Sequence, residues 1–210
     1  MGLFISNMNF IKRFSTSSRY WENRYAINGN SGIGSYGALA DYKASVINKF
    51  VMEGKFEKII DFGCGDGNQL QYFAFPRYIG LDVSATALEK CRLQFKNDCS
   101  KEFFQYNPNV GPGEQVKNFG ADLAISLDVI YHLVEDDIFE TYMRHLFSAS
   151  SKCVIIYAWN VVGIRKRHVK HRMFTDWVEK NEKSWLLKQA IENKELEGAS
   201  DFFIFEKTVN

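Results

Sequence analysis

The sequence predicts an α/β fold, in which helices cover both faces of a mostly parallel sheet. Short apolar runs, typical of buried strands, alternate along the chain with longer segments of helical periodicity. The length of 210 residues suits one domain with a sizeable core. A short segment containing residues 198–200 separates the last two strand-like runs, which favours an antiparallel hairpin at one edge of the sheet.

The individual elements follow from the spacing of apolar residues. In the first helix, Leu39, Tyr42, Val46 and Phe50 recur at helical spacing, and Gly54 ends the element. The predicted helices span residues 36–53, 85–97, 135–149 and 174–182. The predicted strands span residues 57–62, 78–82, 102–106, 121–127, 152–159, 185–191 and 201–207.

The composition excludes several classes of protein. Aromatic residues make up 15% of the chain, so it is not disordered. The formal net charge of +1 is too small for the whole protein to attract nucleic acid or an anionic membrane. No apolar stretch is long enough to span a bilayer. The four cysteines form no C-x-x-C pair, so we expect no metal site and a reducing, cytoplasmic compartment.

The first 19 residues are expected to be a leader, with a single domain over 20–210. Gly2 and Ser6 match a myristoylation pattern. The stretch 1–20 also lacks acidic residues and is rich in serine and basic residues, as organelle transit peptides are. A plain flexible leader is the interpretation we favour over either signal.

The strongest motif is DFGCGDG at residues 61–67. It follows a predicted buried strand, and a helix is expected to follow it. Glycines let a ligand approach the backbone closely, and a helix N-terminus presents free N–H groups. Asp82 ends the next strand, 21 residues after Asp61, where a carboxylate can accept hydrogen bonds from both ribose hydroxyls. The motif therefore predicts a ribose-containing ligand across the strand ends.

The details of this motif favour one ligand. A dinucleotide site has G-x-G-x-x-G, but Asn68 stands where its third glycine would fall from Gly63. Asp61 would repel a pyrophosphate, and it suits the cationic methionine end of S-adenosylmethionine. A dinucleotide and a ligand-free strand–helix turn are the weaker alternatives.

DFGCGDG followed by Asp82 resembles the class I S-adenosylmethionine-dependent methyltransferases over about residues 20–207. The resemblance implies a Rossmann-like, doubly wound, seven-stranded sheet of order 3-2-1-4-5-7-6 with strand 7 antiparallel. Three stretches, 20–37, 126–137 and 168–178, are similar to small bacterial methyltransferases of polysaccharide and related metabolite pathways.

The resemblance also implies roles for individual residues. Gly63, Gly65 and Gly67 would line the methionine and ribose, and Asp61 would lie near the amino group. Asp82 would hold the ribose hydroxyls. Other cofactor contacts expected by position are Val83 against adenine, Asn107 at the adenine amino group and Asp128 facing the methionine part.

The segment 28–37, NGNSGIGSYG, is too long for a simple turn. A linker is one interpretation. We favour a lid over the cofactor, because the segment precedes the first predicted helix and is accompanied by Trp21, Arg24, Tyr25 and Tyr36. Of these, Trp21, Arg24 and Tyr36 are expected to contact the cofactor, and Arg24 can pair with the methionine carboxylate.

Methyl transfer requires an aligned acceptor and, at a hydroxyl, a base. His132 follows Asp128 closely and is a candidate base, with a packing role as the alternative. Residues 165–172 carry five basic side chains after the fifth strand. We expect His171 and Arg172 to contact an anionic acceptor there, although a solvated charged turn is the plainer interpretation.

Two negative observations narrow the reaction. The sequence after the fourth strand lacks the Pro-Pro-aromatic run of base N-methylating enzymes, and no cysteine follows a proline as in cytosine C5 enzymes. We therefore expect O-methylation of a small or glycan-like anionic acceptor, and regard nucleic acid as an unlikely partner. RNA or protein methylation is the nearest enzymatic alternative, and a cofactor-binding module without catalysis is the other.

Overall fold

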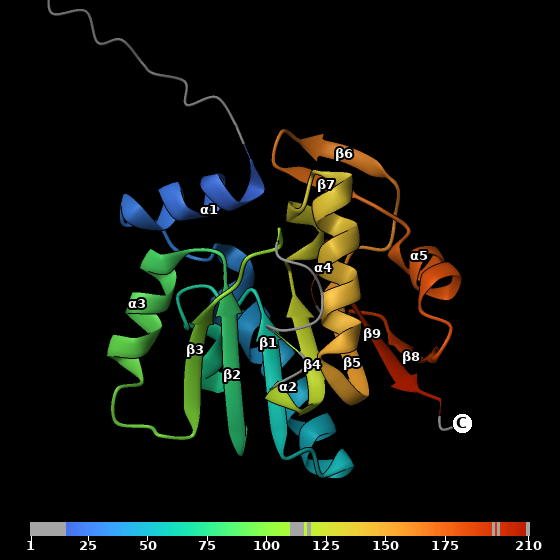
Figure 1. Cartoon of the computed structure of the whole chain (residues 1–210), viewed down its shortest axis with the longest axis horizontal. Helices are drawn as coiled ribbons and strands as arrows, with labels where there is room; N and C mark the ends of the chain where they lie inside the picture. The colour runs from blue at the N-terminus through green and yellow to red at the C-terminus, as the bar shows by residue number, and fades with distance from the viewer. Residues whose placement is uncertain (1–15, 110–115, 117–118, 195, 197, 209–210) are drawn as a thin grey trace, which may run out of the picture.

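The computed structural model describes residues 16–109, 116, 119–194, 196 and 198–208. Its centre is a seven-stranded sheet of order β3-β2-β1-β4-β5-β9-β8 (Figure 1). The strands are β1 (Lys58–Phe62), β2 (Arg77–Asp82), β3 (Lys101–Gln105), β4 (Ala121–Leu127), β5 (Ser150–Ala158), β8 (Trp185–Ile191) and β9 (Asp201–Lys207). β9 runs antiparallel to both β5 and β8, whereas the pairs among β1 to β5 are parallel. The predicted order and the antiparallel last strand are confirmed.

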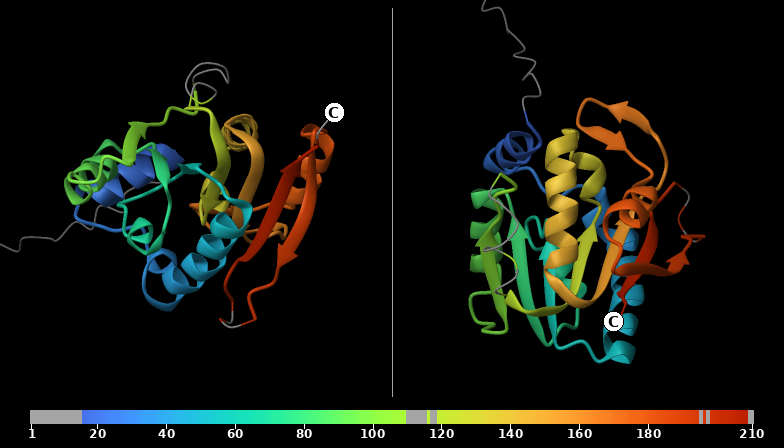
Figure 2. Two further views of the ribbon diagram at one scale, coloured as in Figure 1. Left: turned by 90° about the horizontal axis from the view of Figure 1, so that it is seen from below. Right: turned by 45° about the vertical axis from the view of Figure 1, so that its right-hand side comes forward.

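Helices cover both faces of this sheet (Figure 2). On one face, α2 (Gly37–Gly54) and α3 (Ala85–Gln94) pack against alternate strand residues such as Leu123 and Ile125. On the other, α4 (Asp136–Ser148) and α5 (Phe174–Asn181) cover the intervening ones, such as Ala124. Successive strand side chains point to opposite faces, so one apolar run supplies both cores.

Helix α1 (Ser17–Ala26) was not predicted, and it begins inside the expected leader. The Thr16 hydroxyl accepts a hydrogen bond from the Arg19 amide and caps the helix. Ser17 is buried: its amide donates to the Glu135 carboxylate, and its hydroxyl donates to the His132 carbonyl oxygen over 2.7 Å. The folded domain therefore includes residues before Tyr20. The lipidation pattern at Gly2 and Ser6 lies outside the described residues, as does the part of the transit-like stretch 1–20 before Thr16.

Two further expectations differ from the structure. The glycine loop is followed by the short 3-10 turn η2 (Gln69–Tyr72) and not by an α-helix. The chain returns to β2 at Arg77, which leaves too little length for several helical turns. The expected basic loop is an antiparallel hairpin, β6 (Gly163–Lys166) with β7 (Val169–His171).

Helix α1 and the β6–β7 hairpin both lie above the carboxyl ends of the parallel strands (Figure 1). This is the edge where ligands bind in open α/β sheets. Among the described residues, no helix is both long and apolar enough to cross a membrane.

Candidate active site

The glycine loop after β1 adopts backbone conformations that favour glycine, and it packs closely against neighbouring segments. Gly63 has φ 89°, and a Cβ there would lie 2.5 Å from Val129 Cγ2. Gly65 has φ 58°, and a Cβ there would lie 2.3 Å from Ser31 Oγ. Any larger residue at either position would therefore be strained and would clash with a neighbouring segment.

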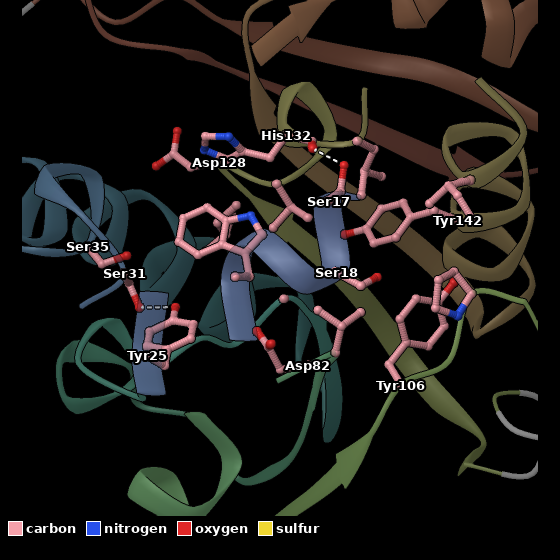
Figure 3. A pocket seen from close by; sticks show the side chains of 18 residues that line it. Ser17, Ser18, Tyr25, Ser31, Ser35, Asp82, Tyr106, Asp128, His132 and Tyr142 are labelled. Carbon is pink, nitrogen blue, oxygen red and sulfur yellow. Dashed lines mark hydrogen bonds between the residues drawn. The ribbon is translucent and has the colours of Figure 1, made fainter. Parts of the chain in front are cut away.

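A first cavity opens at the carboxyl ends of β1, β2 and β4 (Figure 3). In this view Asp82 and His132 lie at opposite ends, with Ser17 and Ser18 of α1 between them. The predicted site residues that line it are Trp21, Gly63, Asp82, Val83, Asp128 and His132. The lining residues that were not predicted as site residues are Ser17, Ser18, Tyr25, Ser31, Ser35, Tyr106, Pro108, Leu127, Val129, Leu133, Ile138 and Tyr142.

Helix α1 supplies much of what sequence reasoning missed. Ser17, Trp21 and Tyr25 are spaced by four residues and lie on one face of a helix. That spacing was a usable signal. It was not recognised because the segment has few apolar residues and falls partly within the expected leader.

Asp82 joins the strand end to the glycine loop. One carboxylate oxygen accepts a hydrogen bond from the Gly65 amide over 2.9 Å, and the other accepts one from the Ser84 amide over 2.8 Å. Burial raises the pKa of Asp82 to about 6, against these two hydrogen bonds that lower it. Each oxygen keeps a second lone pair, so the carboxylate still has capacity for ribose hydroxyls.

Asp61 lies outside the cavity wall. It is buried, and one oxygen accepts a hydrogen bond from the Tyr78 hydroxyl over 2.8 Å, whereas the other has no hydrogen-bond partner among the described residues. Burial raises the pKa of Asp61 to about 7. The structure thus does not bring this carboxylate to where it would touch a methionine amino group.

The segment 28–37 is fastened to the glycine loop through Asp66. The Asp66 carboxylate accepts the Ser31 amide over 3.1 Å, the Ser31 hydroxyl over 2.7 Å and the Tyr36 hydroxyl over 3.0 Å. Ser31 and Ser35 line the first cavity. The segment therefore lies over the glycine loop, as expected of a lid. Tyr36 holds the segment to Asp66 through its hydroxyl and does not line either cavity.

A second cavity of about 460 Å³ adjoins the first, between helix α1, the lid segment and the β6–β7 hairpin. Its wall is rich in aromatic and imidazole rings: Tyr20, Trp21, Tyr131, His132, Trp159, His168 and His171. Five residues line both cavities: Trp21, Ser31, Ser35, Asp128 and His132. The two cavities therefore meet at this shared wall.

His132 lies in this shared wall, and its ring is oriented by the hairpin. Nδ1 is 3.1 Å from the carbonyl oxygen of His168. Because a carbonyl oxygen only accepts, Nδ1 carries the proton of the neutral ring and Nε2 keeps its lone pair. Burial lowers the pKa of His132 to about 4, so the ring is neutral at physiological pH.

A family model described as "Methyltransferase domain" matches residues 60–150, from β1 to the start of β5. Together with the fold, this match supports a methyltransferase enzyme. The predictions of a methyltransferase and of S-adenosylmethionine as its cofactor are confirmed. No curated protein sequence matches the chain.

Solved structures of methyltransferases share the fold of this domain. The N-methyltransferase NodS from Bradyrhizobium japonicum WM9 superposes with a TM-score of 0.72 at 12% identity, covering 92% of this chain and 99% of that one. Magnesium protoporphyrin IX methyltransferase from Synechocystis PCC 6803, with bound S-adenosylmethionine, gives 0.64 at 12% identity, covering 93% and 99%. The methyltransferase domain of bacterial CtHen1-C gives 0.64 at 21% identity, covering 80% and 98%. At these identities the likeness concerns the fold.

The first cavity of the methyltransferase domain has the chemistry that S-adenosylmethionine requires. Asp82 offers an acceptor for ribose hydroxyls, and Gly63 brings the backbone of the glycine loop to the cavity wall, whereas Gly65 lines neither cavity. Val83, Tyr106 and Tyr142 form an apolar and aromatic wall suited to a purine ring.

Several predicted cofactor contacts of the methyltransferase are placed elsewhere. Asn107 is exposed, and its side-chain oxygen accepts the Asn109 amide over 3.0 Å, while its neighbours Tyr106 and Pro108 line the cavity. Arg24 lines the second cavity and not the first, and its Nε donates to the Asn30 carbonyl oxygen over 2.6 Å. Gly67 is absent from both linings; a Cβ there would lie 3.0 Å from the Cys91 sulfur, so this glycine permits close packing.

Arg172 does not face the acceptor side, contrary to expectation. Its guanidinium donates to the carbonyl oxygens of Leu133 and Val134 over 2.7 and 3.2 Å, and to Asp136 over 2.7 Å. Lys170 pairs with the same carboxylate over 2.6 Å. These two charges of the basic segment thus fasten the hairpin to the start of α4. His171 does line the second cavity, with its ring 5.5 Å from that of Tyr131.

Proposed function

We propose that this methyltransferase methylates an oxygen of a small acceptor that binds in the second cavity, with His132 as the base. The observation that carries the proposal is the place of His132 in the wall that both cavities share. A group there can touch an acceptor while the cofactor occupies the neighbouring cavity.

S-adenosylmethionine, when bound, supplies an electrophilic methyl group. Asp82 would hold it by the ribose, and the lid segment fastened at Asp66 would exclude water. His132 would accept the hydroxyl proton of the acceptor at Nε2 as the oxygen attacks, and would later release it to solvent. With its Nδ1 proton bound to the His168 carbonyl, the ring presents this nitrogen in the form needed at neutral pH.

The second cavity also supports a ring-shaped acceptor with a negative group. Trp21, Tyr20 and Trp159 offer ring faces on which a sugar or another flat compound can pack. Among the described lining residues, Arg24 is the permanently charged cation, and it replaces Arg172 as the candidate partner of an acceptor anion. We therefore still predict a glycan-like anionic acceptor, with Arg24 and not Arg172 as the residue that contacts its negative group.

The experiment below distinguishes the proposal from two alternatives: methylation of another kind of acceptor, such as an amine or RNA, and cofactor binding without catalysis. The structural neighbours include an N-methyltransferase, a porphyrin methyltransferase and the small RNA methyltransferase HEN1. A base beside the acceptor favours oxygen, because a hydroxyl must lose its proton, whereas a neutral amine attacks through a free lone pair. A cofactor-binding module without catalysis would not need His132.

The test is methyl transfer from labelled S-adenosylmethionine to a panel of hydroxylated sugars and sugar acids, with small RNAs as a second panel. Turnover of a small acceptor should fall about 10²-fold or more in His132→Gln. His145→Gln is the control: His145 lines neither cavity, and a glutamine can keep a hydrogen bond with the Tyr106 hydroxyl, its partner at 2.9 Å. Turnover of RNA that weakens steeply with salt would replace the proposal, and undiminished turnover in His132→Gln would remove the base.

A further inference from the structure

A buried lysine contacts an active-site carboxylate from helix α2, which lines neither cavity. Lys43 is 1% exposed and lies on α2 among the buried residues Ala40, Ala44 and Ile47. Its Nζ is 2.8 Å from Asp128 Oδ2. Moving an ammonium group out of water is costly, and apolar residues of the same volume are often at least as stable there. The pair is thus poorly explained by stability alone.

Asp128 is the centre of contacts from several separate elements. Its carboxylate accepts hydrogen bonds from the Tyr131 hydroxyl over 2.9 Å and from the Ser200 hydroxyl over 3.3 Å. Its amide donates to the Tyr157 carbonyl oxygen over 2.9 Å. A Cβ on Gly34 of the lid segment would lie 2.7 Å from Asp128 Oδ2, so the lid packs directly on this carboxylate.

The backbone of Asp128 is itself unusual. Its φ is 61°, in the left-handed region that non-glycine residues seldom adopt. Such a conformation is strained and persists where the surroundings enforce it. The strained turn leads directly into η4 (Ile130–His132), which carries His132.

We propose that Lys43 is a positioning residue that, through its ion pair with Asp128, fixes the turn carrying His132 and the seat of the lid. The inference rests on the proposed role of His132 as the base. Lys43 itself lies outside both cavity linings, so it acts through Asp128 and does not touch the acceptor.

The pKa of His132 is sensitive to the charged groups around it. The charged and titratable groups that face it are Asp128 at the end of β4, Arg24 from α1 and His168 from the hairpin. The Asp128 charge raises the pKa of His132, whereas burial and the other two groups lower it. Removing the Lys43 ammonium leaves the Asp128 charge without its compensating cation, which strengthens its attraction for a protonated His132.

The experiment is an NMR titration of ring-labelled histidines, which is practicable because the chain has four. Lys43→Met should raise the pKa of His132 from about 4 towards its ordinary value. Lys43→Met/Asp128→Asn should reverse that rise, because both charges are then absent. Lys49→Met is the matched control: Lys49 lies on the same helix and is 69% exposed, and its loss should leave the His132 titration unchanged.

Ring nitrogen shifts give a second measurement. The wild type should show a single neutral tautomer of His132 with the proton on Nδ1. The double variant leaves no unpaired charge at these two positions and should fold, but its loosened turn should mix the two tautomers. An unchanged His132 pKa in Lys43→Met overturns the inference. If that variant does not fold, a single Nδ1–H tautomer in the double variant overturns it.

Calorimetry with S-adenosylhomocysteine separates this inference from the proposed function. If S-adenosylhomocysteine binds to the wild type and the pKa of His132 is unchanged in Lys43→Met, the role of Lys43 is refuted and the cofactor site stands. No binding to the wild type would instead refute the cofactor site on which the proposed function depends.

Discussion

The affinity of the methyltransferase for its cofactor is expected to depend on the ionisation of Asp82. Ribose hydroxyls donate hydrogen bonds, so they favour the ionised carboxylate over the protonated one. Burial raises the pKa of Asp82 to about 6, which places its titration in an accessible range. Binding should therefore strengthen as pH rises through this pKa.

The size of the effect follows from the fraction of ionised carboxylate. With a pKa of about 6, roughly one protein molecule in ten carries an ionised Asp82 at pH 5, and about nine in ten do so at pH 7. If the ionised form alone binds well, the Kd for S-adenosylhomocysteine should fall about tenfold between pH 5 and pH 7, which is close to 1.4 kcal/mol.

Calorimetry at the two pH values measures this Kd directly. Asp82→Asn keeps the size of the side chain and removes its charge, so its affinity should be lower and independent of pH. Asp61→Asn is the control, because burial raises the pKa of Asp61 to about 7 although this side chain lies outside the cavity. The variant should keep the pH dependence of the wild type.

Equal affinities at pH 5 and pH 7 in the wild type would refute the reasoning. An unchanged pH dependence in Asp82→Asn would show that another group titrates. Loss of the dependence in Asp61→Asn would transfer the effect to that carboxylate.

Three other outcomes are expected. S-adenosylhomocysteine should raise the Tm of the protein and NAD should not; a shift with NAD alone would overturn the cofactor assignment. Arg172→Ala should lower the free energy of unfolding by about 1–3 kcal/mol, because it leaves two carbonyl oxygens without their donor. Lys170→Ala removes a more exposed ion pair and should change the free energy of unfolding little. Equal denaturation midpoints for the two variants would contradict this expectation. Gly65→Ala should destabilise the protein by about 1–3 kcal/mol and weaken cofactor binding by displacing Ser31; unchanged thermal stability and affinity would show that the lid does not pack there.

The sequence alone determined the sheet and indicated the edge at which we propose that the cofactor binds. The apolar runs at 121–127 and at 201–207 match strands β4 and β9 residue for residue. These strands are buried in the sheet, so their local composition and their tertiary surroundings agree. DFGCGDG and Asp82 also predicted the ligand edge, because glycine at positive φ and a carboxylate at a strand end are chemical requirements that few other residues meet.

Helix α1 and the β6–β7 hairpin were decided by tertiary contacts. Ser17 is held by Glu135 and by the His132 carbonyl oxygen, more than a hundred residues away in the chain, and no local periodicity announces such partners. The hairpin is rich in basic residues and resembles a solvated loop in sequence. Arg172 and Lys170 fasten it through a shared partner, Asp136.

The roles of the charged residues likewise depended on the fold. Sequence position placed Arg24, Asp61 and Arg172 in the predicted site. In the structure, Arg24 lines the second cavity and Asp61 accepts a hydrogen bond from Tyr78. Arg172 donates to Asp136 of α4 and to the carbonyl oxygens that precede this helix. Spacing along a chain tells which end of a strand a residue occupies, whereas the direction of its side chain is set by partners that only folding brings near. For the same reason Lys43, an unremarked residue of a predicted helix, acquired its meaning only when the fold set it 2.8 Å from Asp128.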